Sequence, residues 1–172
     1  MELRDIYDAE GRRTGKTITS AQRPGPGERI LVVGCWIVNR RGEIFLTKRS
    51  PQKRYMPNLW ENTGGHAMTG EDGAAAIARE IFEETGVRVE REELILIHRA
   101  KSADAFAEEF VAVKDFSVKD VVLQAGETCD ARWVNEAEWE RMMEVGEIAP
   151  GVTEKVLPLK DKLLEILHGL QK

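Results

Sequence analysis

The chain has 172 residues, of which 42% are hydrophobic and 32% charged, and its formal net charge is −5. These values indicate one globular domain with a sizeable core and exclude a disordered chain. The negative charge argues against nucleic acid as a bulk electrostatic partner, whereas a small phosphorylated substrate needs only a local basic patch.

The first part of the chain is expected to form strands and turns. Residues 1–28 are a predicted extension, in which a short hairpin that turns near Gly11 precedes a loop rich in proline and glycine. The β-branched run Ile30–Val38 predicts a strand that returns as Glu43–Arg49. A loop over Ser50–Asn58 separates this hairpin from the glycine-rich segment that follows.

Glu71–Thr85 is the clearest helix in the chain. Asp72 stands at its start, where a carboxylate caps backbone N–H groups and complements the helix dipole, and Gly86 is placed to end it. Its apolar residues recur with the spacing of one helical face: Ala74, Ile77, Ala78, Ile81 and Phe82.

The second part of the chain alternates strands with helices. Two strands, Leu94–Lys101 and Phe106–Phe116, are expected to pair, and a short strand at Asp130–Asn135 leads into a helix at Glu136–Glu144. Residues 151–170 read as an amphipathic helix that Pro158 interrupts. Together these elements predict one mixed α/β or α+β layer fold spanning residues 1–172.

The apolar positions of the C-terminal helix have two interpretations. Packing onto the sheet explains them, and a homodimer surface is the alternative, so the chain is expected to be a monomer or a homodimer. These positions are Val156, Leu159, Leu163, Leu164, Ile166, Leu167 and Leu170.

No membrane segment is expected, because the longest apolar run, Ile30–Val38, is too short to cross a bilayer. The N-terminal residues do not resemble a signal peptide. Cys35 and Cys129 are far apart and lack the spacing of metal ligands. We expect a cytoplasmic protein with free thiols, in which Cys35 belongs to the core.

Three glutamates crowd the end of the predicted central helix. Glu80 lies three residues before Glu83 and four before Glu84, so their carboxylates share a face beside the apolar stripe. Like charges at this spacing destabilise a helix by a few tenths of a kcal/mol. A bound Mg²⁺ or Mn²⁺ would offset the repulsion, since both cations prefer hard oxygen ligands. The other interpretation is a solvated acidic face.

The surrounding residues resemble the Nudix box, G-x5-E-x7-R-E-U-x-E-E-x-G-U. All nine specified positions match, and average residue usage makes such a match a chance event roughly once in a billion starts. The matching residues are Gly65, Glu71, Arg79, Glu80, Ile81, Glu83, Glu84, Gly86 and Val87.

The resemblance implies a fold, a reaction and a division of roles. The implied fold is a mixed β-sheet sandwiched between helices, with residues 64–87 forming a loop, a helix and a loop. The implied reaction is Mg²⁺- or Mn²⁺-dependent cleavage of a diphosphate, whose negative charge the metal neutralises. By position, the metal ligands would be Glu80, Glu83, Glu84 and the backbone carbonyl of Gly64, while Glu71 and Arg79 would pair with each other.

The sequence offers several candidates for the general base and for the residues that contact the substrate. The candidates for the base are Glu83 and Glu84 within the helix, and Glu109 and Glu127 downstream, which are otherwise surface charges. The basic residues have two interpretations, as phosphate contacts or as a solvated basic loop: Lys48, Arg49, Lys53 and Arg54. Trp60 is either a core residue or a wall of the pocket, and His66 is either structural or a substrate contact.

The wider pattern resembles the branch of the Nudix family that is related to isopentenyl diphosphate isomerase. That isomerase uses a cysteine where this chain has Gly65, and its metal-binding histidine ahead of the first sheet hairpin has no counterpart in "GERILVV". These departures, with the intact box, favour hydrolysis over isomerisation.

The sequence therefore predicts a hydrolase that cleaves a diphosphate bond in a nucleoside diphosphate linked to another moiety, or in a related organic diphosphate. Its partner is a small-molecule diphosphate, without nucleic acid or membrane. Isomerase activity and a non-catalytic nucleotide-sensing domain are the alternatives. The proline and tyrosine that mark two other Nudix subfamilies after the box are absent, so the leaving group stays open.

Overall fold

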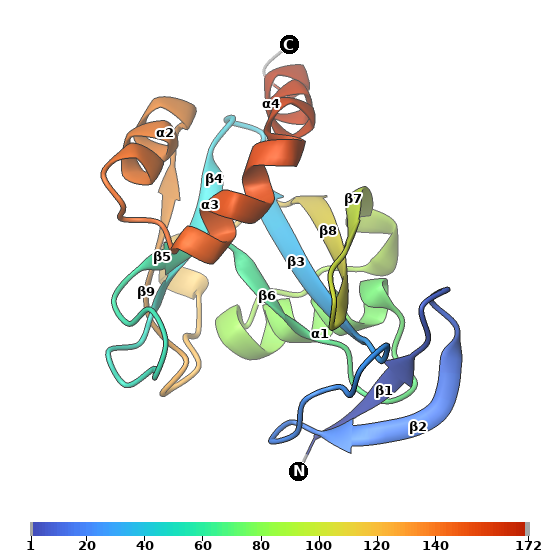
Figure 1. The fold of residues 1–172 in the computed structure, drawn as a ribbon. Helices are drawn as coiled ribbons and strands as arrows, with labels where there is room; N and C mark the ends of the chain where they lie inside the picture. The colour runs from blue at the N-terminus through green and yellow to red at the C-terminus, as the bar shows by residue number, and fades with distance from the viewer. Residues whose placement is uncertain (1, 171–172) are drawn as a thin grey trace.

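The structure, a computed structural model, describes residues 2–170. Its helices and strands form layers (Figure 1). In chain order they are β1 (Leu3–Tyr7), β2 (Arg13–Thr19), β3 (Ile30–Val38), β4 (Ile44–Arg49), β5 (Trp60–Glu61), β6 (Thr63–His66), α1 (Gly73–Thr85), β7 (Leu94–Lys101), β8 (Ala105–Val113), β9 (Thr128–Val134), α2 (Glu136–Glu144), α3 (Pro150–Val156) and α4 (Lys160–Gly169).

The described strands form two sheets. β1 and β2 make a separate antiparallel hairpin, as the sequence predicts. The other seven strands form one mixed sheet in the order β5-β4-β3-β8-β7, in which β6 also pairs with β3 and β9 with β4. β3 and β8 run parallel along their whole length, whereas β7 and β8 are the antiparallel pair expected.

Helices cover both faces of the larger sheet, and each face buries its own apolar core. On one face, α1 packs Ile77 and Ile81 against β3 residues such as Val33. On the other face, α2, α3 and α4 pack around Trp36 and Trp139. The rings of these two tryptophans meet edge to face, with their centroids 5.5 Å apart. Figure 1 shows α3 and α4 in front of the sheet and α1 behind it. This arrangement confirms the predicted mixed sheet between helices.

The strands β3 and β4 meet only beside their turn, where Val38 pairs with Ile44. Farther from the turn they diverge, and β6 takes the edge of β3 while β5 takes the edge of β4. The last residues of β4 and the short strands β5 and β6 therefore gather where the sheet opens.

The helix α1 begins at Gly73, two residues later than predicted. Asp72 keeps an extended backbone (φ −88°, ψ 175°), and its carboxylate accepts the Ala75 N–H at 2.9 Å, so it is the N-cap and not part of the helix. The predicted end is confirmed, because Gly86 adopts φ 72° and its N–H donates to Phe82 O at 2.8 Å.

Phe82 was expected on the buried stripe of this helix, and the structure contradicts that placement. Its side chain is 42% exposed, with the Arg88 guanidinium 4.3 Å from the ring centroid. The buried face is centred on Ile77 and Ile81 and continues to Thr85, which turns Phe82 toward solvent.

The C-terminal segment is broken as predicted. A 3₁₀ turn at Leu157–Leu159, which contains Pro158, separates α3 from α4. The apolar residues Val156, Leu159, Leu163 and Leu167 are buried against the sheet, so packing accounts for this stripe. Each helix within residues 2–170 falls short of the length and apolarity needed to cross a bilayer.

Candidate active site

A polar cleft of about 420 Å³ lies where β3 and β4 diverge. Its backbone wall is Gly64, Gly65 and His66 of β6, with Gln124 from a distant loop. Its acidic side chains are Glu2, Glu61, Glu80, Glu83, Glu84 and Glu127, and its basic ones are Arg4, Arg49 and Lys53. The cleft thus combines carboxylates suited to a cation with cations suited to an anion.

Arg79 holds the central helix to the preceding strand and loop. Its Nε donates to Glu71 Oε1 at 2.8 Å, and its Nη2 donates to Glu71 Oε2 at 3.0 Å and to the His66 carbonyl at 2.9 Å. Glu71 Oε2 also accepts the Met68 N–H at 2.8 Å. The pair expected between Glu71 and Arg79 is therefore present, and it acts as a clasp.

The same guanidinium neutralises two of the three clustered glutamates. Arg79 Nη1 lies 3.0 Å from both Glu80 Oε1 and Glu83 Oε2. Glu80 Oε1 also accepts the His66 N–H at 3.3 Å. The sequence places the three carboxylates on one face of the helix, and Arg79 forms ion pairs with two of them.

Glu84 differs from its neighbours because its half-buried carboxylate makes no hydrogen bond or ion pair with any residue from 2 to 170. Burial raises the pKa of the Glu84 carboxyl well above its usual range, and the negative charges of Glu61, Glu80 and Glu127 add to the shift against Lys53. An unpartnered carboxylate among like charges is a site that a cation would stabilise.

Burial also raises the pKa of Glu80, and the nearby Arg79 only partly offsets it. At Glu71 burial again raises the pKa, but the bonds from Arg79 and the Met68 N–H outweigh it, so the net shift is downward. The difference is physical: Glu71 receives two guanidinium bonds and one backbone N–H, whereas Glu80 is deeper and near Glu83.

The opposite wall of the cleft carries two cations in ion pairs. Arg49 Nη1 contacts both oxygens of Glu61, at 3.0 and 2.8 Å, and its other nitrogens donate to the Tyr55 carbonyl at 3.1 and 2.9 Å. Lys53 forms an ion pair with Glu127. The Lys53–Glu127 pair joins the loop after β4 to the loop before β9, whereas the Arg49–Glu61 pair links the ends of the neighbouring strands β4 and β5.

Because the two glycines of β6 have no side chain, neighbouring atoms lie very close to their backbone. A Cβ atom on Gly65 would lie 2.2 Å from the carboxyl carbon of Glu80, and one on Gly64 would lie 2.7 Å from the Val33 carbonyl oxygen. Gly65 therefore leaves space for the Glu80 carboxylate and supplies no side chain of its own.

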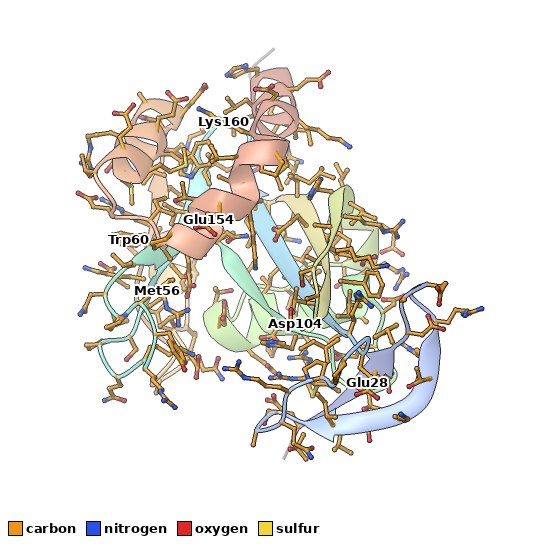
Figure 2. All side chains as sticks on the ribbon, viewed as in Figure 1. Glu28, Met56, Trp60, Asp104, Glu154 and Lys160 are labelled. Atoms are coloured by element: carbon orange, nitrogen blue, oxygen red, sulfur yellow. The ribbon has the colours of Figure 1, made fainter. Side chains whose placement is uncertain are left out.

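Lys48 and Trp60 do not line the cleft, although the sequence suggested both as substrate contacts. The Trp60 side chain is 7% exposed and belongs to the core, where its ring lies between Lys48 Nζ at 5.5 Å and Arg132 Cζ at 4.3 Å from its centroid. Figure 2 labels Trp60 where β5 approaches the start of α3. Trp60 is therefore a core residue and does not form a wall of the cleft.

Glu109 lies in a separate cavity of about 240 Å³, which shares Glu61, Gly64, Gly65 and His66 with the cleft. Burial raises the pKa of Glu109 against the opposing effects of Lys155 and Asn62. Burial also lowers the pKa of His66 to about 4, with Arg4 and Lys155 adding to the shift, so this imidazole is neutral at pH 7.

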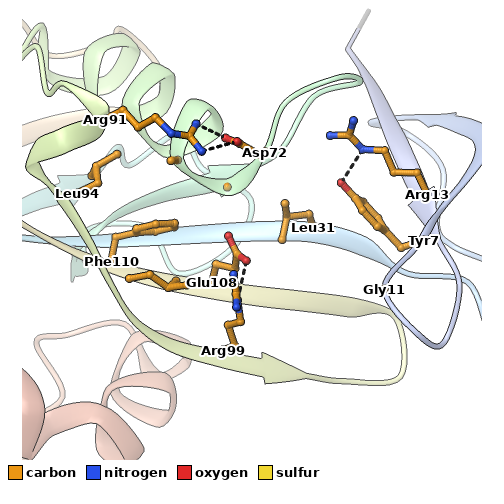
Figure 3. Close-up of a pocket in the computed structure, with 13 residues that line it drawn as sticks. Tyr7, Gly11, Arg13, Leu31, Asp72, Arg91, Leu94, Arg99, Glu108 and Phe110 are labelled. Atoms are coloured by element: carbon orange, nitrogen blue, oxygen red, sulfur yellow. Dashed lines mark hydrogen bonds and ion pairs between the residues drawn. The ribbon is translucent and has the colours of Figure 1, made fainter.

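A third hollow, an open groove of about 550 Å³, contains none of the predicted site residues. Figure 3 shows that Arg91 is paired with Asp72 and Arg99 with Glu108, while Arg13 donates to the Tyr7 hydroxyl. Because the charges of the two ion pairs are already neutralised by one another, they do not call for a charged ligand in the groove.

Several residues of the cleft were not found from the sequence. Arg4 comes from the N-terminal hairpin and Gln124 from the loop before β9, and no local pattern places either beside the glutamates. The signal for Glu61 in the sequence is weak: it is the one charged residue in the segment "LWENTGG" that leads to the box.

Among residues 2–170, no three acidic, histidine or cysteine side chains already stand close enough to bind a metal ion. In this structure Glu80 and Glu83 are instead paired with Arg79. The donor set still suits Mg²⁺ or Mn²⁺, because it consists of hard carboxylate oxygens around the unpartnered Glu84.

Comparison with known proteins identifies the family. A model of the NUDIX domain matches residues 28–155. The chain is 34% identical to an uncharacterized Nudix hydrolase of Listeria monocytogenes over 87% of this chain and 89% of that protein. It is 30% identical to an isopentenyl-diphosphate Delta-isomerase of Mycolicibacterium vanbaalenii, over 93% and 92% of the two chains.

The fold also resembles the crystal structure of a Deinococcus radiodurans protein. The TM-score is 0.73 at 21% identity, and the match covers 92% of this chain and 99% of that one. The domain match and the identity to a Nudix hydrolase over most of both chains agree with the box on α1. The chain belongs to the Nudix hydrolase family.

Proposed function

We propose that this protein is a Mg²⁺- or Mn²⁺-dependent hydrolase that cleaves a diphosphate bond in a nucleoside diphosphate linked to another moiety, or in a related organic diphosphate. The observation that carries the proposal is the unpartnered Glu84 carboxylate, surrounded by four further glutamates from α1, β5 and the loop before β9. Opposing basic residues give the same cleft an affinity for phosphate oxygens.

Glu80, Glu83 and Glu84 would hold the metal, with the carbonyl of Gly64 as a further ligand. When bound, the cation neutralises diphosphate charge and lowers the pKa of an attacking water. The pairing of Arg79 with Glu80 and Glu83 keeps those carboxylates near the cleft before any cation arrives.

Arg49 and Lys53 would bind and orient the diphosphate. Arg49 is already fixed by Glu61 and by the Tyr55 carbonyl, so little conformational entropy is lost when it meets a phosphate. Lys53 exchanges its partner Glu127 for the substrate, which frees a carboxylate beside the reacting group.

That exchange keeps Glu127 among the candidates for the general base, together with Glu83 and Glu84. Glu109 is less well placed for this role, because it lines the neighbouring cavity and not the cleft. The pH–rate profiles of the three Glu→Gln variants distinguish them, since only loss of the base removes the corresponding limb.

The proposal is tested by a phosphate-release screen with Mg²⁺ and with Mn²⁺. The panel contains nucleoside diphosphate sugars, dinucleotides, nucleoside di- and triphosphates, and isoprenoid diphosphates. We expect turnover of at least one class and a loss of several orders of magnitude in kcat for Glu83→Gln and Glu84→Gln. Affinity without turnover of any member would favour the nucleotide-sensing alternative.

Isomerase activity is a second candidate because of the similarity to a Mycolicibacterium vanbaalenii isomerase. Neither cysteine supplies a thiol to the cleft: Cys35 is 1% exposed in the core, and the exposed Cys129 is not among the cleft residues. Incubation with isopentenyl diphosphate, followed by analysis for the allylic isomer, separates the two reactions. Formation of that isomer would replace hydrolysis as the proposed activity.

The proposal also includes a cytoplasmic location and a small-molecule partner. Both cysteines are free, which agrees with a reducing compartment. Light scattering decides between the monomer and the homodimer.

A further inference from the structure

The N-terminal hairpin is fastened to the loop that leads into α1. Three hydrogen bonds join it to successive residues of this loop: Thr69 N–H to Leu3 O at 2.8 Å, Gly70 N–H to Asp5 Oδ2 at 3.0 Å, and Arg13 Nη2 to Glu71 O at 2.6 Å. Tyr7 and Arg29 exchange two backbone hydrogen bonds, at 2.7 and 3.0 Å. The strand β1 is therefore held at its first and its last residue, beside the clasp that Glu71 forms with Arg79.

This docking places one side chain of β1, that of Arg4, at the cleft. Successive residues of a strand point to opposite faces, so Arg4 shares its face with Ile6, which is completely buried. Arg4 lines the cleft together with His66, and its positive charge contributes to the lowered pKa of that imidazole. A cation of the hairpin therefore lies within electrostatic reach of β6.

The charge of Arg4 has no partner among residues 2–170. Its side chain forms no ion pair and no hydrogen bond with these residues, and its Nε atom is buried and unpaired. Proteins rarely leave a buried donor in that state. Unlike Nε, the terminal nitrogens Nη1 and Nη2 are not shut off from solvent, so they are the donors that a ligand in the cleft would meet.

The other two cations of the cleft are already neutralised. Arg49 pairs with Glu61, and Lys53 pairs with Glu127, so each must release or share a carboxylate before it binds an anion. Arg4 breaks no ion pair with residues 2–170 when an anion arrives, so none of the attraction is spent on separating charges. Among the basic residues of the cleft, it is the one already prepared for an anion.

The three cations approach the cleft from two sides. Figure 1 shows β1 on one side of β6 and the loop between β4 and β5 on the other. Arg4 belongs to β1, whereas Arg49 ends β4 and Lys53 lies in that loop. A diphosphate has several non-bridging oxygens, so it can be held from both sides at once. The hairpin precedes residue 28, where the match to the NUDIX domain begins, so Arg4 comes from outside the matched residues.

We propose that the N-terminal hairpin is part of the active site and that Arg4 binds non-bridging oxygens of the substrate diphosphate through Nη1 and Nη2. This proposal rests on the diphosphate hydrolase function proposed above. A planar guanidinium donates two parallel N–H bonds to a phosphate group, which a lysine ammonium cannot reproduce. Because β1 is fixed at both ends, Arg4 meets the diphosphate without ordering a mobile segment.

The test measures binding of methylenediphosphonate, a diphosphate analogue whose P–C–P link is not hydrolysed, by calorimetry with Mg²⁺ at pH 8 and low salt. We expect Arg4→Gln to weaken this binding by about ten- to hundredfold, the effect of hydrogen bonds between charged groups. Arg4→Lys keeps the charge without the two parallel donors, so it should recover only part of the affinity. Mg²⁺ binding without the analogue should not weaken in either variant, because a positive charge does not assist a cation.

Arg12→Gln is the matched control. Arg12 belongs to the same hairpin and its variant loses the same charge, but it pairs with Asp8 and Glu10 at the exposed turn and does not line the cleft. It should bind the analogue as tightly as the wild type does. An equal loss in Arg12→Gln and Arg4→Gln would show that the total charge of the hairpin matters and not a contact of Arg4, which would overturn the proposal.

The remaining outcomes separate this proposal from the proposed function. Unchanged analogue binding in Arg4→Gln overturns the role of Arg4, even if the wild type hydrolyses a diphosphate. Weakened Mg²⁺ binding and a lower Tm in both Arg4 variants would make the residue structural, which overturns it as well, as does a wild type that binds no analogue. If the wild type hydrolyses nothing in the screen but binds the analogue through Arg4, the hydrolase proposal fails and the anion site stands.

Discussion

Arg79 and Glu71 form a two-bond pair, with Nε to Oε1 at 2.8 Å and Nη2 to Oε2 at 3.0 Å, and both side chains are only about one-fifth exposed. We expect Glu71→Gln to lower the free energy of unfolding by about 1–3 kcal/mol, because the guanidinium loses its charged partner. Urea denaturation measures the change.

The matched control for this variant is Glu10→Gln. Glu10 pairs with Arg12 on the surface, where the two side chains are 64% and 74% exposed, so its loss should leave the free energy of unfolding nearly unchanged. Equal costs at the two positions would show that the clasp adds nothing to stability. The pKa of Glu71 is lowered in the fold, so its contribution is present above the unfolded pKa and disappears as the pH falls through the folded one.

Glu84→Gln should stabilise the metal-free protein and abolish its function. The Glu84 carboxyl has a raised pKa because it is buried near other carboxylates, so its charge is unfavourable at neutral pH and an amide removes that cost. Differential scanning calorimetry in EDTA is expected to show a higher Tm than wild type. A lower Tm would mean that the charge is compensated by contacts absent from this structure.

Mg²⁺ should raise the Tm of the wild-type protein at pH 7–8 through binding to the folded state. The gain should shrink as the pH falls, because Glu80 and Glu84, with raised pKa values, take up protons before ordinary carboxyls do. For the metal-free protein the sign is opposite: the folded state binds more protons than the unfolded one at these two groups, so their contribution to stability grows on acidification. Thermal melts with Mg²⁺ or EDTA across this range test both trends. If Mg²⁺ raised the Tm by the same amount at every pH, the result would argue against Glu80 and Glu84 as metal ligands.

Gly65→Ala should weaken metal binding with little loss of fold. The added Cβ would overlap the Glu80 carboxylate, which must move away from its bonds with Arg79 and the His66 N–H. We expect at least about a tenfold rise in the Mg²⁺ concentration for half-maximal activity, on the scale known for displaced metal ligands and their supports. Gly151→Ala, where an added Cβ has no neighbour within 4 Å, is the control. Unchanged Mg²⁺ dependence in Gly65→Ala would remove Glu80 from the metal site.

Local patterns were sufficient for most of the elements. Ile30–Val38, Leu94–Lys101 and Glu136–Glu144 have the predicted bounds, because β-branched runs and a capped amphipathic segment determine their own structure. The start of α1 was wrong by two residues since Asp72 serves as its cap, a choice that depends on the bond to Ala75.

Long-range placement was the part that the sequence could not supply. Trp60 and Lys48 precede the box as closely as Arg49 and Glu61 do, yet successive residues of a strand point to opposite faces, and only the fold decides which face meets the cleft. Glu108 and Glu109 make the same point in β8, where one lines the separate groove and the other the cavity beside the cleft. The spacing of the box predicted Glu80, Glu83 and Glu84 together, because a helix fixes their relation locally.

The parallel ladder between β3 and β8 also has a kinetic consequence. Its partners, such as Ile30 and Ala105, are about 75 residues apart in the chain, and α1 lies within the loop that this pairing closes. Closing such a loop costs entropy before its contacts form, which slows folding relative to the local β1–β2 hairpin. The helix with the glutamates can form early, but the cleft that gives them their chemistry is completed only when the two halves of the sheet come together.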